Sequence, residues 1–124
     1  EALGELNGFD EEFFAYVEDA ELSVRMTGAG YRMLFQPAAR VLHHSPPPGS
    51  DPTPFQIRQR DRNRRRVMRK HFLVVQRLPF LFRFFLTRGI LYSRYLLQGE
   101  RDRARAILEG MGDDVPNPDK SSLP

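Results

Sequence analysis

The chain has 124 residues, which is enough for one small domain with a modest core but not for two. It contains no cysteine, which excludes disulfides and thiolate metal sites and fits a reducing compartment. Residues 1–50 hold eight acidic and three basic side chains, a net charge of −5, whereas residues 54–109 hold fifteen basic and four acidic ones, a net charge of +11. We therefore expect the two halves to have different partners, with an anionic surface for the second half.

The first fifty residues contain patterns of both helix and strand. Gly8 followed by FDEEFF predicts a turn that leads into a short acidic helical segment. Residues 18–29 predict a helix, because Glu21 and Arg25 are spaced i,i+4 in the favourable order and glycines at 28 and 30 can end it. YRMLF (31–35) and ARVLHH (39–44) predict two short strands, and the proline-rich stretch 45–54 predicts a loop or linker.

The second half predicts helices. Residues 55–72 predict a basic helix, residues 78–97 are the most apolar part of the chain, and residues 100–111 predict an amphipathic helix that ends at Gly110 or Gly112. The tail from Asp113 is expected to be disordered. The predicted divisions are an N-terminal part at 1–50, a Pro-rich linker and basic helix at 51–70, amphipathic C-terminal helices at 71–112 and a tail at 113–124.

Residues 7–44, NGFDEEFFAYVEDAELSVRMTGAGYRMLFQPAARVLHH, carry an ordered set of motifs. A Gly-Phe-Asp-Glu turn precedes an aromatic run, a Glu-Asp pair, a Leu and an Arg on the next helical turns, a Gly-Tyr-Arg strand, a Pro and a strand that ends in His. In this order the segment resembles the C-terminal half of a family 2 glycosyltransferase, and the basic, apolar continuation resembles that of rhamnosyltransferase-like members. The resemblance implies an α/β fold class, with the C-terminal portion of a GT-A (Rossmann-like) domain followed by a mostly helical extension.

The resemblance implies inverting transfer of a sugar from a nucleotide-diphosphate sugar to a glycan or lipid-linked acceptor, as in cell-wall polysaccharide biosynthesis. Such a displacement needs a carboxylate that takes the proton of the acceptor hydroxyl. The family's pattern assigns this general base to Asp19, with Glu18 beside it to orient the acceptor or the base. The alternative from charge placement alone is that Glu18, Asp19 and Glu21 form a solvated first helical turn, which the helix dipole favours.

The resemblance also implies substrate-binding roles for Asp10, Phe14, Tyr16 and Arg25. Asp10 is expected to cap or orient the turn, and the two aromatic side chains are expected to form pocket wall and core. Arg25 shares a helix face with Glu18, which makes it a candidate ion-pair partner.

In the family a His at the end of the second strand approaches the Mn²⁺ or Mg²⁺ ion that binds the diphosphate. His43 aligns with that His, so the resemblance implies that it is a metal ligand. His44 would point to the opposite face of the strand, and two adjacent strand residues are poorly placed to bind one ion together. The alternative for a lone His is a structural role.

The sequence has no counterpart of the family's nucleotide-binding half. It contains no Asp-x-Asp motif for the metal and diphosphate and no Gly-rich phosphate loop. The resemblance therefore implies a fragment or a truncated product. We expect that the 124 residues alone neither hydrolyse nor transfer from a nucleotide-sugar, and that they bind Mn²⁺ only weakly.

The second half has two candidate partners, nucleic acid and an anionic membrane. The cationic block at 58–70 can neutralise nucleic-acid phosphates, but it holds no aromatic residue for base stacking, which disfavours nucleic acid. The arginines that follow it fall within an arc of roughly 120° on a helix and leave the rest of its surface to apolar side chains: Arg77, Arg83, Arg88 and Arg94.

No uncharged run in this region is long enough to span a bilayer. The pattern favours a helix in the headgroup plane of an anionic membrane, which implies a cytoplasmic protein held peripherally at the inner face of the cell membrane. Packing of the same face onto the catalytic domain is the alternative. The hypothesis from a different class is a non-catalytic basic module that binds membrane or nucleic acid, with the acidic segment merely structural.

Overall fold

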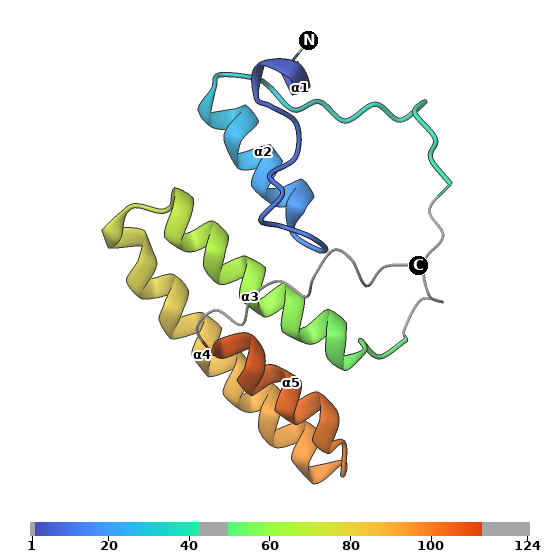
Figure 1. Cartoon of the computed structure of the whole chain (residues 1–124), viewed down its shortest axis with the longest axis vertical. Coiled ribbons are helices and arrows are strands. Elements are labelled where there is room, and N and C mark those ends of the chain that lie inside the picture. The colour runs from blue at the N-terminus through green and yellow to red at the C-terminus, as the bar shows by residue number, and fades with distance from the viewer. Residues whose placement is uncertain (1, 43–49, 113–124) are drawn as a thin grey trace.

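The computed structural model describes residues 2–42 and 50–112 of the chain (Figure 1). Within these ranges it contains five α-helices and no strand. The helices are α1 (Ala2–Glu5), α2 (Glu18–Gly28), α3 (Pro54–His71), α4 (Val74–Leu97) and α5 (Arg101–Met111). Figure 1 shows α3 in the middle of the molecule, with α2 on one side and the pair α4 and α5 on the other.

The predicted α/β fold class is wrong for the described part of the chain, which is all-helical. The first predicted strand, 31–35, and the described part of the second, 39–42, form no strand. Figure 1 shows this segment running away from the helices, with no other extended segment beside it. A strand needs a neighbour to satisfy its backbone N–H and C=O groups. Without one, the apolar side chains stay between 81% and 91% exposed: Leu34, Phe35, Val41 and Leu42.

The acidic segment before α2 is built from turns, so the predicted short helix there is wrong. The carboxylate of Asp10 accepts the backbone N–H of Glu12 at 3.0 Å, which closes a local turn that competes with a helix. The short helix of this region is instead α1, for which no pattern was found. The tail at 113–124 and half of the predicted loop at 45–54, residues 45–49, lie outside the described residues.

The four longer helices confirm the helical predictions. Helix α2 ends at Gly28, one residue before the predicted end, and contains the predicted i,i+4 ion pair between Glu21 and Arg25 at 2.9 Å. Helix α3 begins at a proline, and a capping box between Thr53 and Gln56 satisfies its first N–H groups. Helix α5 ends at Met111 with Gly112 as its C-cap, as the glycine positions predicted.

Helix α5 packs against both α3 and α4 and supplies most of the core. Ile107 is fully buried, together with the small side chains of Ala104 and Ala106, against Ile57 of α3 and Tyr95 of α4. At the other end of the hairpin, an aromatic cluster joins α3 to α4, with ring centroids 5.6 to 5.7 Å apart: Phe72, Phe80 and Phe84. Burial of these apolar side chains provides the main driving force for the hairpin.

A buried carboxylate also links α3 to α4. Asp61 has no exposed surface, and Arg88 donates to its Oδ1 at 3.1 Å. Burial raises the pKa of the Asp61 carboxyl above its ordinary value, although the charges of Arg88 and Arg64 oppose this effect. The pair therefore joins the middle of α3 to the middle of α4.

Helices α3 and α5 come into backbone contact at Gly110. A Cβ atom at this position would lie 3.0 Å from the Cβ of Asp61 and 3.1 Å from the carbonyl oxygen of Arg58. Only glycine therefore fits without displacing α3. Gly89 lies in the interior of α4 and is exposed, and a Cβ atom there would meet nothing within 4 Å.

Replacing Gly110 with Ala should lower the free energy of unfolding, whereas Gly89→Ala should raise it. Both variants gain the helix propensity of Ala, worth about 1 kcal/mol. Only the methyl at position 110 meets backbone, and overpacking of this kind costs about 1–3 kcal/mol. Urea denaturation should therefore give a difference of about 1–3 kcal/mol between the variants. Equal effects would contradict the close approach of α3 and α5.

Candidate functional site

The turn before α2 has an uncommon backbone conformation. Tyr16 and Val17 both have positive φ, at 65° and 73°. This conformation is unfavourable for a residue with a β-carbon and most unfavourable for a β-branched one, so the turn stores strain of about 1–3 kcal/mol per residue. Residues in such conformations gather at active sites and ligand clamps.

Asn63 of α3 holds this turn in place. Its amide nitrogen donates to the carbonyl oxygens of Ala15 at 2.9 Å and Tyr16 at 2.8 Å. The side chain is 1% exposed, so both bonds are shielded from water. The start of α2, with Glu18 and Asp19, is therefore positioned by a side chain more than forty residues away in the sequence.

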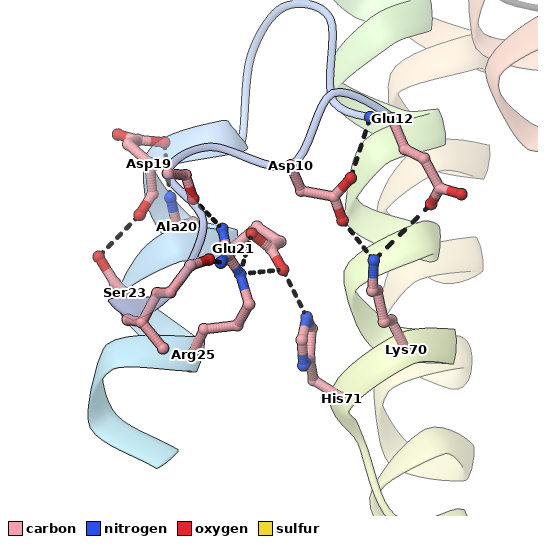
Figure 2. A network of polar contacts seen from close by, with 11 residues as sticks. Asp10, Glu12, Asp19, Ala20, Glu21, Ser23, Arg25, Lys70 and His71 are labelled. Atoms are coloured by element: carbon pink, nitrogen blue, oxygen red, sulfur yellow. Dashed lines mark hydrogen bonds and ion pairs between the residues drawn. The ribbon is translucent and has the colours of Figure 1, made fainter. Parts of the chain in front are cut away.

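Asp19 lines a pocket of about 350 Å³ between α2, α3 and α4. Its Oδ1 accepts the backbone N–H of Ala20 at 2.8 Å, and its backbone carbonyl accepts the hydroxyl of Ser23 (Figure 2). The residue is exposed, and within 2–42 and 50–112 its carboxylate makes no ion pair. The pocket is lined by Tyr16, Val17, Asp19, Ala20, Arg60, Arg64, Val67, Phe72 and Phe80.

Two arginines of α3 give the pocket a cationic wall. The guanidinium of Arg60 lies over the ring of Tyr16, 5.0 Å from its centroid. Arg64 is 3.7 Å from the buried carboxylate of Asp61 and is itself 46% exposed. The pocket thus combines a carboxylate, two guanidinium groups and apolar aromatic surface, a combination that suits a ligand with hydroxyl, anionic and apolar parts.

Glu18 is half-buried next to Asp19. Its Oε2 is enclosed and accepts no hydrogen bond from the residues that the structure describes. A buried carboxylate oxygen without a partner costs free energy and calls for an explanation in a native structure. Its position beside Asp19 is compatible with the orienting role that the resemblance implies.

Among the three carboxylates of α2, Glu21 is the one that is fully buried, not Asp19 or Glu18. Arg25 binds both of its oxygens through Nε at 2.9 Å, and Nε2 of His71 from the end of α3 lies 2.9 Å from its Oε1 (Figure 2). The other nitrogens of Arg25 donate to the carbonyl oxygens of Leu6 at 2.6 Å and Gly8 at 2.8 Å. Arg25 therefore ties the N-terminal turns to α2, as an ion-pair partner of Glu21 rather than of Glu18.

Asp10 forms a second link between the acidic segment and α3. Lys70 binds its carboxylate and lies 3.8 Å from Glu12 (Figure 2). Partial burial opposes ionisation of Asp10, but the hydrogen bond and charge of Lys70 outweigh this effect and lower the pKa of Asp10 below its ordinary value. The same hydrogen bond raises the pKa of Lys70.

The structure says less about the other predicted site residues, Phe14, Tyr16 and His43. Phe14 is half-buried and is not among the residues that line the pocket, whereas Tyr16 forms part of its wall. His43 lies outside the described residues, as does His44. In the part of the chain that the structure describes, no three His, Cys, Asp or Glu side chains are grouped closely enough to hold a metal ion. The prediction of a metal site at His43 is therefore not tested by the described residues.

Sequence reasoning missed the α3 side of the site. Arg60 and Arg64 were predicted only as members of a basic block, and Asn63 was not singled out. Their spacing carried a usable signal, because positions 60, 63, 64, 67 and 71 fall on one face of a helix. That face is the one that α3 presents to α2 and the pocket.

Comparison with known proteins finds partial relatives. The chain is 46% identical over 43 residues to an N-acetylglucosaminyl-diphospho-decaprenol L-rhamnosyltransferase of Mycobacterium tuberculosis, a match found in strains CDC 1551 / Oshkosh and ATCC 25618 / H37Rv. It is 40% identical over 40 residues to rhamnosyltransferase WbbL of Escherichia coli (strain K12). No family model matches the chain, and no solved structure matches it significantly.

These matches confirm the resemblance for a limited part of the chain. The aligned segments cover 35% and 32% of this chain and only 14% and 15% of the mycobacterial and E. coli relatives. The chain therefore corresponds to a small part of the length of these relatives. About a third of it is related to rhamnosyltransferases.

Asn63→Ala should destabilise the turn that carries Asp19. The substitution leaves two carbonyl oxygens without their buried donor, which costs about 1–3 kcal/mol. Amide hydrogen exchange should become faster at residues 18–21, because the strained turn is no longer held. The amides of α5, which does not contact the turn, serve as the internal control and should exchange as before. Unchanged exchange at residues 18–21 would show that Asn63 does not position the site.

Proposed function

We propose that this chain is the acceptor-side part of an inverting glycosyltransferase, with Asp19 as the general base. The donor is a nucleotide-diphosphate sugar, and the acceptor is a lipid-linked saccharide of the kind that the name of the mycobacterial relative describes. The observation that carries the proposal is that Asp19 shares a pocket with two arginines, in a chain partly related to rhamnosyltransferases.

The proposed reaction is a single displacement. Asp19 accepts the proton of the acceptor hydroxyl while that oxygen bonds to the anomeric carbon of the donor. The bond from this carbon to the diphosphate oxygen breaks at the same time, and the nucleotide diphosphate leaves with the bonding electrons. The exposed, unpaired carboxylate of Asp19 is accessible to the hydroxyl, and the strained turn held by Asn63 limits the directions in which it can point.

A resident Mn²⁺ or Mg²⁺ ion, with His43 among its ligands, stays a proposal that rests on the resemblance alone. The described residues do not assemble a set of metal ligands for it.

Asp19→Asn should lower the transfer rate by about 10²- to 10⁴-fold in the glycosyltransferase that contains this sequence, because an amide cannot take the proton. Binding of the nucleotide-sugar, measured by calorimetry, should change little. Asp102→Asn is the matched control, since this exposed carboxylate lies in the first turn of α5 and outside the pocket. Retained turnover in Asp19→Asn would refute the assignment of the base.

The second candidate function is a membrane-binding module, which the outer face of α4 favours. Four apolar side chains on one face are between 53% and 74% exposed: Leu78, Phe82, Leu86 and Ile90. Exposed apolar surface of this extent on one helix marks an interaction site. No helix in residues 2–42 and 50–112 combines the length and the apolar content needed to cross a membrane.

The four arginines of α4 do not all face outward toward a membrane surface, as their spacing predicted. Arg77 turns back to the end of α3, where it donates to the carbonyl oxygens of Phe72 at 3.0 Å and Arg69 at 2.9 Å. Arg88 pairs with Asp61. The exposed Arg83 and Arg94 remain beside the apolar face on the helical projection, where they would meet the headgroups of anionic lipids.

The double variant Phe82→Gln with Leu86→Gln should lose at least about tenfold in vesicle binding, because each buried apolar side chain contributes about 1.5–3 kcal/mol. The assay is flotation with phosphatidylglycerol vesicles and, for comparison, phosphatidylcholine vesicles. The control is Leu3→Gln with Leu108→Gln, which removes exposed leucines from other helices. If the chain does not float but shifts nucleic acid in a salt-dependent manner, the membrane proposal is wrong and nucleic acid is the partner.

A further inference from the structure

The two arginines that line the pocket have no role in the proton transfer from the acceptor. In the described part of the chain, the guanidinium group of Arg60 stacks on Tyr16 and donates no hydrogen bond, although its charge also acts on Asp61. Arg64 has one long contact, 3.7 Å, to Asp61. A guanidinium group carries five N–H donors in a fixed planar arrangement, so most of the donors of both side chains are available to a ligand.

The fold neutralises this pair of charges only in part. Asp61 is the nearest acidic partner of Arg64, but Arg88 binds it more closely, at 3.1 Å. Arg60 and Arg64 are spaced i,i+4 on α3, so their side chains lie on the same face of the helix. The result is a local excess of positive charge in the pocket that also contains Asp19.

The cationic surface continues toward α4. A second pocket of about 370 Å³ lies next to the first and shares Arg64 and Phe80 with it. Its other lining residues include Arg83, Phe84 and Thr87. Arg64 and Phe80 thus form walls of both the pocket that contains Asp19 and the pocket that contains Arg83.

We propose that Arg60 and Arg64 bind a diphosphate group, that of a prenyl-linked acceptor, while Asp19 faces the hydroxyl of the sugar attached to it. This inference rests on the proposed function. Guanidinium groups bind phosphate oxygens through paired, charge-assisted hydrogen bonds. In an acceptor whose sugar is joined directly to the diphosphate, the reacting hydroxyl and the diphosphate are one sugar ring apart. The base and its cationic partners must then share one small pocket, as Asp19, Arg60 and Arg64 do.

The aromatic side chains in the same pocket support a prenyl diphosphate over a nucleotide diphosphate. Phe72 and Phe80 provide apolar surface next to the arginines, and Phe84 extends it in the second pocket. A hydrocarbon chain attached to the diphosphate would pack against this aromatic surface. The diphosphate of the sugar donor has the same charge chemistry, so the experiment must separate the two sources.

The test is calorimetric titration of the 124-residue chain with three probes: inorganic pyrophosphate, farnesyl diphosphate and dTDP. Farnesyl diphosphate should bind most tightly, because it engages both the arginines and the aromatic surface. Arg60→Gln and Arg64→Gln should each weaken its binding by about tenfold or more, which corresponds to the loss of charge-assisted hydrogen bonds. Arg64→Lys should give an intermediate affinity, because it keeps the charge but loses the paired hydrogen bonds.

Arg101→Gln is the matched control, since it removes the same charge from an exposed position on α5 outside both pockets. It should change the affinity for farnesyl diphosphate by less than about twofold, because salt screens an exposed charge that lies outside the pockets. Equal weakening by Arg101→Gln, or unchanged binding in both pocket variants, would overturn the proposal. So would tighter, arginine-dependent binding of dTDP, which would assign the arginines to the donor.

The affinity measurement is independent of turnover. Loss of farnesyl diphosphate binding in the arginine variants, together with full activity of Asp19→Asn, would leave the diphosphate site standing and refute the proposed base. The thermal unfolding midpoint of each variant, followed by circular dichroism, separates loss of binding from loss of fold. Arg64 is 46% exposed, so its replacement should leave that midpoint nearly unchanged.

Discussion

The hydrogen bonds from Asn63 to the carbonyl oxygens of Ala15 and Tyr16 are the contact on which the site depends. They join two parts of the chain that lie far apart in the sequence. One part is the acidic turn and α2, and the other is the packed group of α3, α4 and α5. Because Asn63 is buried, these bonds are worth more than surface contacts, and their loss leaves carbonyl oxygens unsatisfied. This contact therefore helps to hold the turn that forms one wall of the pocket against α3.

Attraction between the two oppositely charged halves supports the same contact. Lys70 binds Asp10, His71 binds Glu21, and Arg66 donates to the carbonyl oxygen of Glu12 at 2.7 Å. Part of the basic block is thus used inside the molecule, which the count of charges along the sequence does not reveal. The expectation of a separate partner for each half is not tested, and it can concern only the cations that make no such internal contact, on the pocket side of α3 and the outer side of α4.

The sequence predicted the helices well because local signals define them. The capping box of Thr53 and the i,i+4 pair of Glu21 and Arg25 both join residues that are close in the sequence. Glycines near the ends of α2 and α5 are likewise local signals of where a helix stops. The strands failed for the opposite reason. The alternation in YRMLF makes a strand only beside a neighbouring strand, and the described part of the chain supplies none.

Only the α2 side of the site could be predicted from the sequence. The order of the motifs predicted Asp19 and Glu18 as site residues. The positive φ angles of Tyr16 and Val17 could not be predicted, because positive φ is usually indicated by glycine and neither residue is glycine. Arg60 and Arg64 were hidden among many similar side chains. Which arginines of a basic helix can bind a ligand depends on which acidic side chains the fold brings near them. Here Asp61 of α3 pairs most closely with Arg88 of α4. That choice is a property of the packing of α3 against α4.

The close contact at Gly110 has a consequence for how the pocket can adapt. The carbonyl oxygen and Cα of Arg58 meet position 110 without a side chain between them, so backbone contact sets the separation of α3 and α5. Tightly packed atoms resist compression far more than long polar side chains do. The wall of the pocket formed by α3 is therefore stiff. The wall formed by α2 is attached through side-chain hydrogen bonds and ion pairs, so differences in pocket width between ligands of different size must be taken up by α2, and with it by Asp19.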